Sequence, residues 1–181
     1  MLKIEARPTD PTRMRVLIVE DDAVSRTVLG AKVERLGHEW EAVGDGLEAW
    51  TAFQTGSFEV VLTDWMMPAL DGVELCRRIR AREAEGYTYV IFLTAFGGDR
   101  HVLEGMKAGA DDYLVKPVAS QQLEARFVAA QRVTALHQAI AEREHRLERM
   151  NRAVERTRRL ESMNQLAGGI AHDFNNSLRS S

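Results

Sequence analysis

Cysteine is almost missing from this chain of 181 residues, which has a single one, Cys76. One cysteine excludes a disulfide framework and any zinc site built from several thiolates. No apolar run approaches the roughly 20 residues needed to cross a bilayer. The charged, proline-containing start does not have the pattern of a signal peptide. We therefore expect a cytoplasmic protein without a membrane partner.

Proline and lysine are absent from the C-terminal third. All four prolines lie at or before Pro117, and all ten basic residues of 119–181 are arginines. Residues 1–118 carry 14 basic against 20 acidic side chains, whereas residues 119–181 carry 10 against 7. The net charge of −3 is thus the sum of an acidic part and a mildly basic part. This difference in charge and composition indicates two structurally different regions.

Short apolar runs alternate with helical patterns over the first 120 residues. The runs that predict strands are residues 16–19, 60–63, 89–93 and 113–115, and residues 40–43 predict a weaker strand. The helical patterns are residues 23–36, 47–53, 73–80 and 102–106, the first with Val24, Val28, Ala31 and Leu36 near helical spacing. Strands and helices that alternate in this way predict an α/β fold with a doubly wound parallel sheet.

A long helical pattern without proline follows Ser120. From Val133 a heptad can be written. Position a holds Val133, Ile140, Leu147 and Val154, and position d holds Leu136, Arg143, Met150 and Thr157. Two polar d residues and a stammer at Leu160 make the seam imperfect. Because so long a helix is not stable alone in water, we expect a homodimeric coiled coil.

Polar residues follow the predicted strands directly. Glu20 and Asp21 come after the first strand, Asp64 after the third, Thr94 after the fourth and Lys116 after the fifth. In a parallel sheet these positions share one edge, where three carboxylates repel one another. Bound Mg²⁺ would offset that repulsion. The ammonium group of the lysine and the hydroxyl of the threonine could donate hydrogen bonds to a phosphoryl group attached to one aspartate. The adjacent acids are the better metal ligands, so Asp64 is the candidate nucleophile.

Three neighbouring residues have simpler interpretations. Asp22, just before a helix, is expected to be its N-cap. Trp65 either shields an acyl phosphate on Asp64 from water or only packs against the adjacent loop. Cys76 shares a helical face with two apolar residues and is expected to be a small buried hydrophobe.

The order and spacing of these motifs resemble the receiver domain of two-component response regulators. The matching stretches are VLIVEDD (16–22), VVLTDWMMP (60–68), Asp71-Gly72, FLTA (92–95) and AGADDYLVKP (108–117). The resemblance implies a flavodoxin-like fold with strand order 2-1-3-4-5. It also implies Asp64 as the phosphoacceptor.

The same resemblance assigns roles to the other site residues. Mg²⁺ would be held by Glu20, Asp21, Asp64 and the backbone carbonyl of Met66. Lys116 would contact the phosphoryl group and Thr94 would report its presence. Tyr113 would be the aromatic residue that changes position on phosphorylation. Without the motif we would interpret it as an amphipathic ring at the surface. The Lys116–Pro117 peptide bond would be cis.

The stretch QLAGGIAHDFNN (165–176) resembles the phosphoacceptor helix, or H-box, of histidine kinases. This implies that His172 is phosphorylated and that Asp173 polarises its imidazole as a base. The alternative is a solvent-exposed helix residue, which is also how we interpret His137 and His145. No ATP-binding motif is recognised, so we do not expect autophosphorylation. The chain is then a piece of a receiver-containing histidine kinase, or a standalone receiver with a vestigial docking helix.

The expected organisation has four parts. They are a flexible arm (1–13), a receiver domain (14–120), an extended helix and coiled-coil linker (121–162) and an H-box segment (163–181). The expected function is phosphorelay signalling, with a histidine kinase or phosphotransfer protein as partner and no nucleic acid. The alternatives are a dimeric scaffold with an inactive receiver, or a metal-dependent phosphatase, which would need an acid where Met66 stands.

Overall fold

The computed structural model describes the backbone of residues 13–82, 86–95 and 99–179. It describes the side chains of these residues except 99–102, 157 and 160–179. The chain divides into two compact units, Met1–Gln138 and Ala139–Ser181. The expected N-terminal arm, apart from Arg13, lies outside the described residues.

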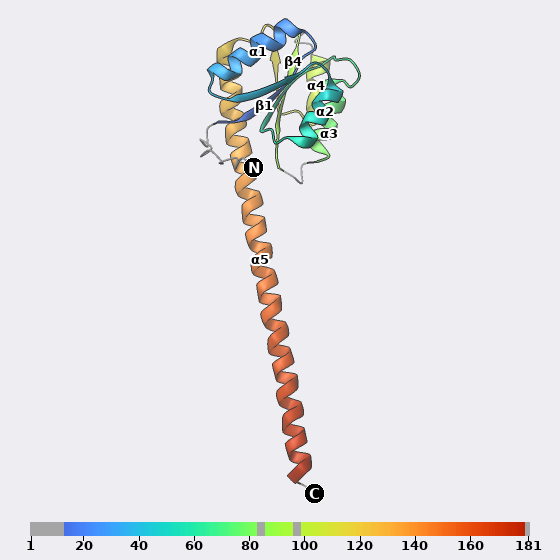
Figure 1. Ribbon diagram of the computed structural model, residues 1–181, viewed down its shortest axis with the longest axis vertical. Coiled ribbons are helices and arrows are strands. Elements are labelled where there is room, and N and C mark those ends of the chain that lie inside the picture. Colours follow the sequence, from blue (N-terminus) through green and yellow to red (C-terminus); the bar gives the residue numbers. More distant parts are fainter. Residues whose placement is uncertain (1–12, 83–85, 96–98, 180–181) are drawn as a thin grey trace, which may run out of the picture. The chain divides into compact units, whose positions relative to one another are not determined.

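The first unit is built on five parallel strands (Figure 1). The strands are β1 (Arg15–Val19), β2 (Glu39–Val43), β3 (Val60–Asp64), β4 (Tyr89–Thr94) and β5 (Asp112–Val115). The helices are α1 (Ala23–Arg35), α2 (Gly46–Thr55), α3 (Gly72–Arg80), α4 (Asp99–Lys107) and α5 (Ser120–Arg179). The sheet order β2-β1-β3-β4-β5 confirms the predicted topology.

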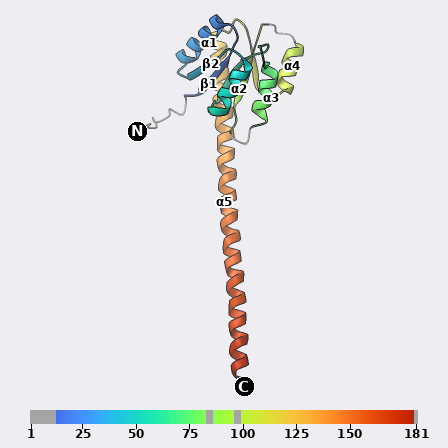
Figure 2. The same cartoon turned by 45° about the vertical axis from the view of Figure 1, so that its right-hand side comes forward.

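Helices cover both faces of the sheet (Figures 1 and 2). On one face, Val16 and Ile18 of β1 pack with residues of α1 and the start of α5. On the other, Leu17 and Val19 pack with residues of α2 and α3. All four strand residues are 0% exposed, because a parallel sheet between two helical layers buries both sides of each strand.

Helix α1 forms where the sequence predicts it but buries a different face. Val24 and Val28 are 71% and 48% exposed. The buried residues are instead Leu29, Gly30 and Val33. The two valines therefore belong to the surface of the first unit and not to its core.

Helix α5 extends from the first unit through the second. Its buried residues in the first unit are Leu123, Phe127, Ala130 and Thr134. In the second unit every described side chain is exposed, including those of the predicted seam, Ile140, Leu147, Met150 and Val154. In a single chain this apolar seam is therefore uncovered. Among the described residues, none of the helices combines the length and the apolar character needed to span a membrane.

Candidate functional site

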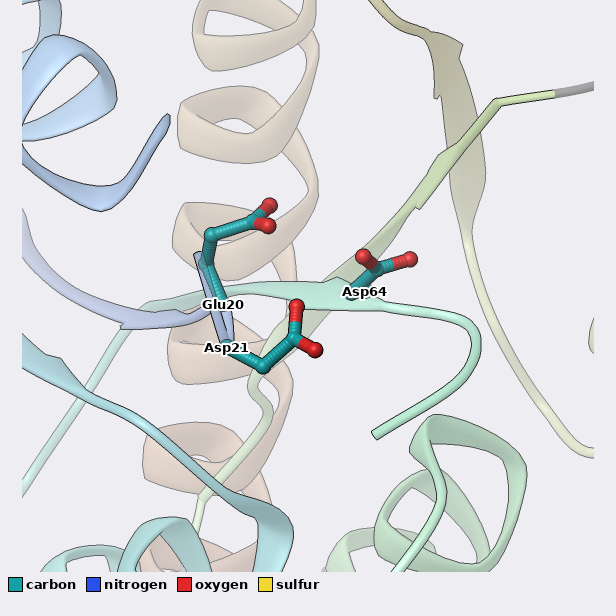
Figure 3. A group of neighbouring side chains, drawn as sticks. All are labelled: Glu20, Asp21 and Asp64. Atoms are coloured by element: carbon teal, nitrogen blue, oxygen red, sulfur yellow. The ribbon is translucent and has the colours of Figure 1, made fainter. Parts of the chain in front are cut away.

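Three carboxylates gather at the carboxyl edge of the sheet (Figure 3). Glu20 and Asp21 follow β1, and Asp64 ends β3, which pairs with β1 in the sheet. One oxygen from each of the three lies within 4.8 Å of the others. The parallel register therefore brings together acids that are more than 40 residues apart in the chain.

Lys116 places its ammonium group among these acids. Its Nζ atom lies 2.6 Å from Asp64 Oδ2 and 2.6 Å from Glu20 Oε2. The lysine is positioned by its backbone N–H, which donates to the carbonyl oxygen of Thr94 at 2.8 Å. The following bond, Lys116–Pro117, is cis, as predicted. One cation thus contacts two of the three acids directly.

The pKa values of this cluster depend on burial and on the ion pairs. Burial raises the pKa of Glu20, and the charge of Asp64 acts in the same direction against Lys116. Burial acts to lower the pKa of Lys116, but the hydrogen bond that Lys116 donates to Asp64 and the negative charges of Asp64 and Glu20 outweigh it and raise that pKa. Lys116 is therefore held charged beside the three carboxylates.

The donor set fits a hard divalent cation. Glu20 is 1% exposed, and its Oε2 atom has no hydrogen bond of good geometry despite the nearby ammonium group. A buried carboxylate oxygen left in this state beside two further carboxylates suits Mg²⁺, which prefers oxygen ligands. Arg26 stabilises the backbone of the acidic pair, because its Nη1 donates to the carbonyl oxygens of Glu20 and Asp21.

The residues beside Asp64 fix its loop. The backbone N–H of Trp65 donates to Asp64 Oδ1 at 2.6 Å. A Cβ atom on Gly72 would lie only 2.2 Å from the carbonyl oxygen of Asp64, so only glycine permits this approach of α3. Met66 follows in the loop with its side chain 77% exposed, and the role of its carbonyl stays a prediction.

Thr94 and Tyr113 lie on adjacent strands next to this edge. Thr94 ends β4 and is 7% exposed. Tyr113 lies on β5, where it pairs in register with Phe92, and its side chain is 37% exposed. The two predicted switch residues line one cavity with Trp65, and Thr94 is buried whereas Tyr113 is partly exposed.

The other interpretations made from the sequence have mixed outcomes. Asp22 is the N-cap of α1, as predicted, and a hydrogen bond from the backbone of Ser25 lowers its pKa. Cys76 is buried, as predicted. His172 and Asp173 fall within α5 but outside the residues whose side chains are described.

Two histidines have contacts that the sequence did not indicate. His38 accepts a hydrogen bond from the backbone N–H of Met14 at 3.3 Å and packs edge-on against Phe127. His137 is exposed, as predicted, yet one face of its ring stacks on Tyr87. Both contacts join segments distant in the chain, so no local motif could have revealed them.

Comparison with known proteins places these features in one family. The sequence profile described as the response regulator receiver domain matches residues 16–128. A gliding motility regulatory protein of Myxococcus xanthus is 41% identical over 104 residues, which are 58% of this chain and 13% of that protein. A probable transcriptional regulator of Guillardia theta is 39% identical over 123 residues, which are 68% of this chain and 47% of that protein. The chain thus spans half or less of the length of these relatives.

Solved structures show the same similarity. The receiver domain of a Francisella response regulator has a TM-score of 0.62 and 34% identity, with 67% of this chain and 98% of that chain covered. The receiver domain of a Pseudomonas aeruginosa sensor histidine kinase, with magnesium coordinated in its active-site cleft, has a TM-score of 0.59 and 33% identity, covering 65% and 97%. A Saccharomyces cerevisiae receiver domain in complex with a histidine phosphotransfer protein has a TM-score of 0.60 and 25% identity, covering 64% and 86%.

Proposed function

Because the chain belongs to the response regulator receiver family of two-component signalling, we propose that it accepts a phosphoryl group on Asp64. The observation that carries this proposal is the ion pair of Lys116 with Asp64 inside a cluster of three carboxylates. The three carboxylates repel one another and Lys116 offsets only part of that repulsion, so a divalent cation complements the cluster, and the lysine can then bind a phosphoryl oxygen.

The transfer forms one bond and breaks another. An oxygen of Asp64 attacks the phosphorus atom of a phosphohistidine or of a small acyl phosphate. The bond from phosphorus to the departing nitrogen or oxygen breaks, and its electron pair stays with the leaving group. A departing imidazole takes a proton from water, and Lys116 binds a phosphoryl oxygen as Asp64 loses its charge.

Glu20, Asp21 and Asp64, with the carbonyl of Met66, would hold Mg²⁺ in this reaction. When bound, the ion supplies positive charge between the carboxylates and the phosphoryl oxygens. The magnesium described in the receiver domain of the Pseudomonas aeruginosa kinase supports this assignment. In the phosphorylated state Thr94 donates its hydroxyl hydrogen to a phosphoryl oxygen, and Tyr113 moves inward.

The proposed donor is a histidine kinase or a histidine phosphotransfer protein. A groove of 370 Å³ lies beside the site, with Glu20 and Lys116 in its wall. The exposed Val24 and Val28 also line it, which gives these surface valines a role in docking a partner. The similarity to a receiver domain co-crystallised with a histidine phosphotransfer protein supports this type of partner.

The second unit is proposed to pair with a second copy of the chain. Exposed Ile140, Leu147 and Val154 recur every seven residues and would be covered in a coiled coil. Phosphorylation at Asp64 would change how two receivers pair, and the coil would carry that change toward His172. His172 is proposed as a second phosphoryl acceptor with Asp173 as its base, on the strength of the H-box sequence.

The proposal is tested with radiolabelled acetyl phosphate and Mg²⁺. Wild type should be labelled, Asp64→Asn should not, and chelation of Mg²⁺ should prevent labelling. Asp22→Asn is the matched control, because asparagine caps a helix as well as aspartate does and the residue lies outside the carboxylate cluster. Labelling of Asp64→Asn would contradict the assignment. No labelling of wild type would favour the alternative, a dimeric scaffold with an inactive receiver and a vestigial H-box.

A further inference from the structure

Trp65, which follows Asp64 in the chain, lines a small cavity together with the two predicted switch residues. Its ring lies against Phe92, with the ring centroids 4.8 Å apart. The same indole reaches the backbone of α4, where a Cβ atom on Gly105 would lie 2.9 Å from Trp65 Cζ3. Trp65 is therefore seated in the apolar layer beneath α4 and is not confined to the loop that follows Asp64.

The remaining space next to this indole is too small for another ring. A cavity of about 10 Å³ is lined by Trp65, Thr94, Met106 and Tyr113, among others. About 10–15 Å³ is the least that one water molecule requires. A phenol ring cannot enter such a space, and Tyr113 is 37% exposed.

The backbone of Trp65 is hydrogen-bonded to Asp64 and also to Leu93 and Gly72. Its backbone N–H donates to Asp64 Oδ1 at 2.6 Å, and an ionised acceptor makes this bond stronger than one between neutral groups. When the other oxygen forms an acyl phosphate, Oδ1 becomes a neutral carbonyl oxygen. The shortest of the hydrogen bonds made by the Trp65 backbone then loses its charge-assisted character, whereas the bonds to Leu93 and Gly72 do not change.

We propose that Trp65 is a positioning residue that couples Asp64 to Tyr113. The indole occupies the space that Tyr113 needs, and phosphorylation of Asp64 weakens the bond that keeps the indole there. Displacement of Trp65 admits the Tyr113 ring. This inference rests on the proposed phosphorylation of Asp64.

The test uses fluorine NMR of the full chain labelled with 3-fluorotyrosine. The chain has three tyrosines, and the Tyr113→Phe variant assigns the resonance of Tyr113. Beryllofluoride with Mg²⁺ serves as the phosphoryl analogue. Trp65→Ala empties the space, and Trp65→Phe reduces the ring while keeping apolar contact. Trp50→Ala is the matched control, because Trp50 stacks on Phe53 of α2, outside the cavity lining.

In wild type the Tyr113 resonance should move to a buried position when beryllofluoride is added. In Trp65→Ala it should lie at that position, or be shifted toward it, before any analogue is added. In Trp65→Ala the beryllofluoride concentration at half-saturation should fall on the order of tenfold. The reason is that the conformer with Tyr113 inward, which binds the analogue, would already be the major one in this variant. The Tyr113 resonance and the half-saturation concentration of Trp65→Phe should lie between those of wild type and Trp65→Ala. Trp50→Ala should match wild type in both.

An outward Tyr113 in both Trp65 variants, with the wild-type midpoint, would overturn the inference. The resonances of Tyr87 and Tyr89 report whether each variant is folded, and Trp65→Phe replaces Trp65→Ala if the latter unfolds. Failure of the proposed function has a different signature, since wild type would then show no response that depends on Asp64. The position of Tyr113 without analogue tests the steric argument in either case.

Discussion

Tyr87 and His137 stack face to face, with ring centroids 3.8 Å apart and planes within 4° of parallel. Tyr87 precedes β4, and its hydroxyl donates a hydrogen bond to Asp111, just before β5. Arg80 forms a 2.6 Å ion pair with Asp111, and its guanidinium carbon lies 5.0 Å from the Tyr87 ring centroid. The receiver therefore holds α5 as far as His137, the penultimate residue of the first unit.

Removing this stack should destabilise the first unit. His137→Ala is expected to lower the free energy of unfolding by about 1 kcal/mol, since a packed aromatic pair contributes about 0.5–1.5 kcal/mol beyond its buried area. Urea unfolding followed by tryptophan fluorescence measures the change, because all three tryptophans lie in the first unit.

The matched control for that experiment is His145→Ala, an exposed histidine further along α5. It should change the free energy of unfolding by less than about 0.5 kcal/mol. A double-mutant cycle with Tyr87→Leu should return a coupling energy of the same size as the loss at His137. Equal effects of the two histidine variants, or no coupling to Tyr87, would show that the stack does not stabilise the fold.

The strands and the acidic edge could be predicted because they depend on short-range patterns and on topology. Four of the five strands are continuous apolar runs, as burial on both faces demands. The ends of parallel strands share one edge, so Glu20, Asp64 and Lys116 had to lie near one another once the sheet was assigned.

The stack and the buried face of α1 could not be predicted from such patterns. Tyr87 and His137 meet only because the chain folds, and no spacing rule connects them. In α1, Val24 and Val28 have the spacing of a core face, but Leu29 and Val33 offer a second apolar face, and the sheet selects the latter. Helical periodicity identifies candidate faces, whereas packing against other elements decides between them.

A second prediction concerns pH and His38. Burial lowers the pKa of His38, and the charge of Arg13 adds to this effect. The imidazole accepts a hydrogen bond at Nδ1 from Met14, so the fold favours the neutral ring. Between the unfolded value of about 6.5 and the lower native pKa, the unfolded chain binds more protons. Stability should therefore be fully present above pH 6.5 and fall as the pH decreases through this window.

Urea unfolding at a series of pH values from about 5 to 7.5 measures this slope. His38→Gln should remove the part due to His38, which cannot exceed about 1.4 kcal/mol per pH unit for one group. His145→Gln should keep the wild-type slope, because that side chain is exposed. If His38→Gln retained the full slope, another group would be responsible for it.

A third prediction concerns the metal and Lys116. Replacing the ammonium group by the apolar side chain of Lys116→Met leaves the three carboxylates without their internal cation. The variant should be less stable than wild type without metal, and its melting temperature should rise more when Mg²⁺ is added, because tighter binding gives a larger stabilisation at equal metal concentration. Arg152→Met, on exposed helix, is the control for loss of one cation.

Thermal unfolding with and without Mg²⁺, at constant ionic strength, provides the measurement for Lys116→Met. An equal rise in melting temperature for wild type and variant would mean that Lys116 and Mg²⁺ do not share the carboxylates. A rise in Arg152→Met equal to that in Lys116→Met would show that the effect is one of net charge and not of position.

The final prediction concerns the exposed seam of α5. Ile140, Leu147 and Val154 are 47%, 53% and 49% exposed in the single chain, so pairing with a second copy would remove apolar surface from water. Arg143 occupies a d position, which weakens the seam and makes the remaining apolar residues decisive. Leu147→Glu should therefore convert a dimer into a monomer, and Arg143→Leu should tighten the dimer.

Sedimentation equilibrium over a range of protein concentrations distinguishes these outcomes. Ala141→Glu is the matched control, because it also adds one negative charge to exposed helix but lies at position b, outside the seam. It should leave the dimer intact. A monomeric wild type, or equal dissociation of both glutamate variants, would contradict the assigned seam. Dissociation confined to Leu147→Glu would identify this face of α5 as the contact between two copies, since only position distinguishes the two variants.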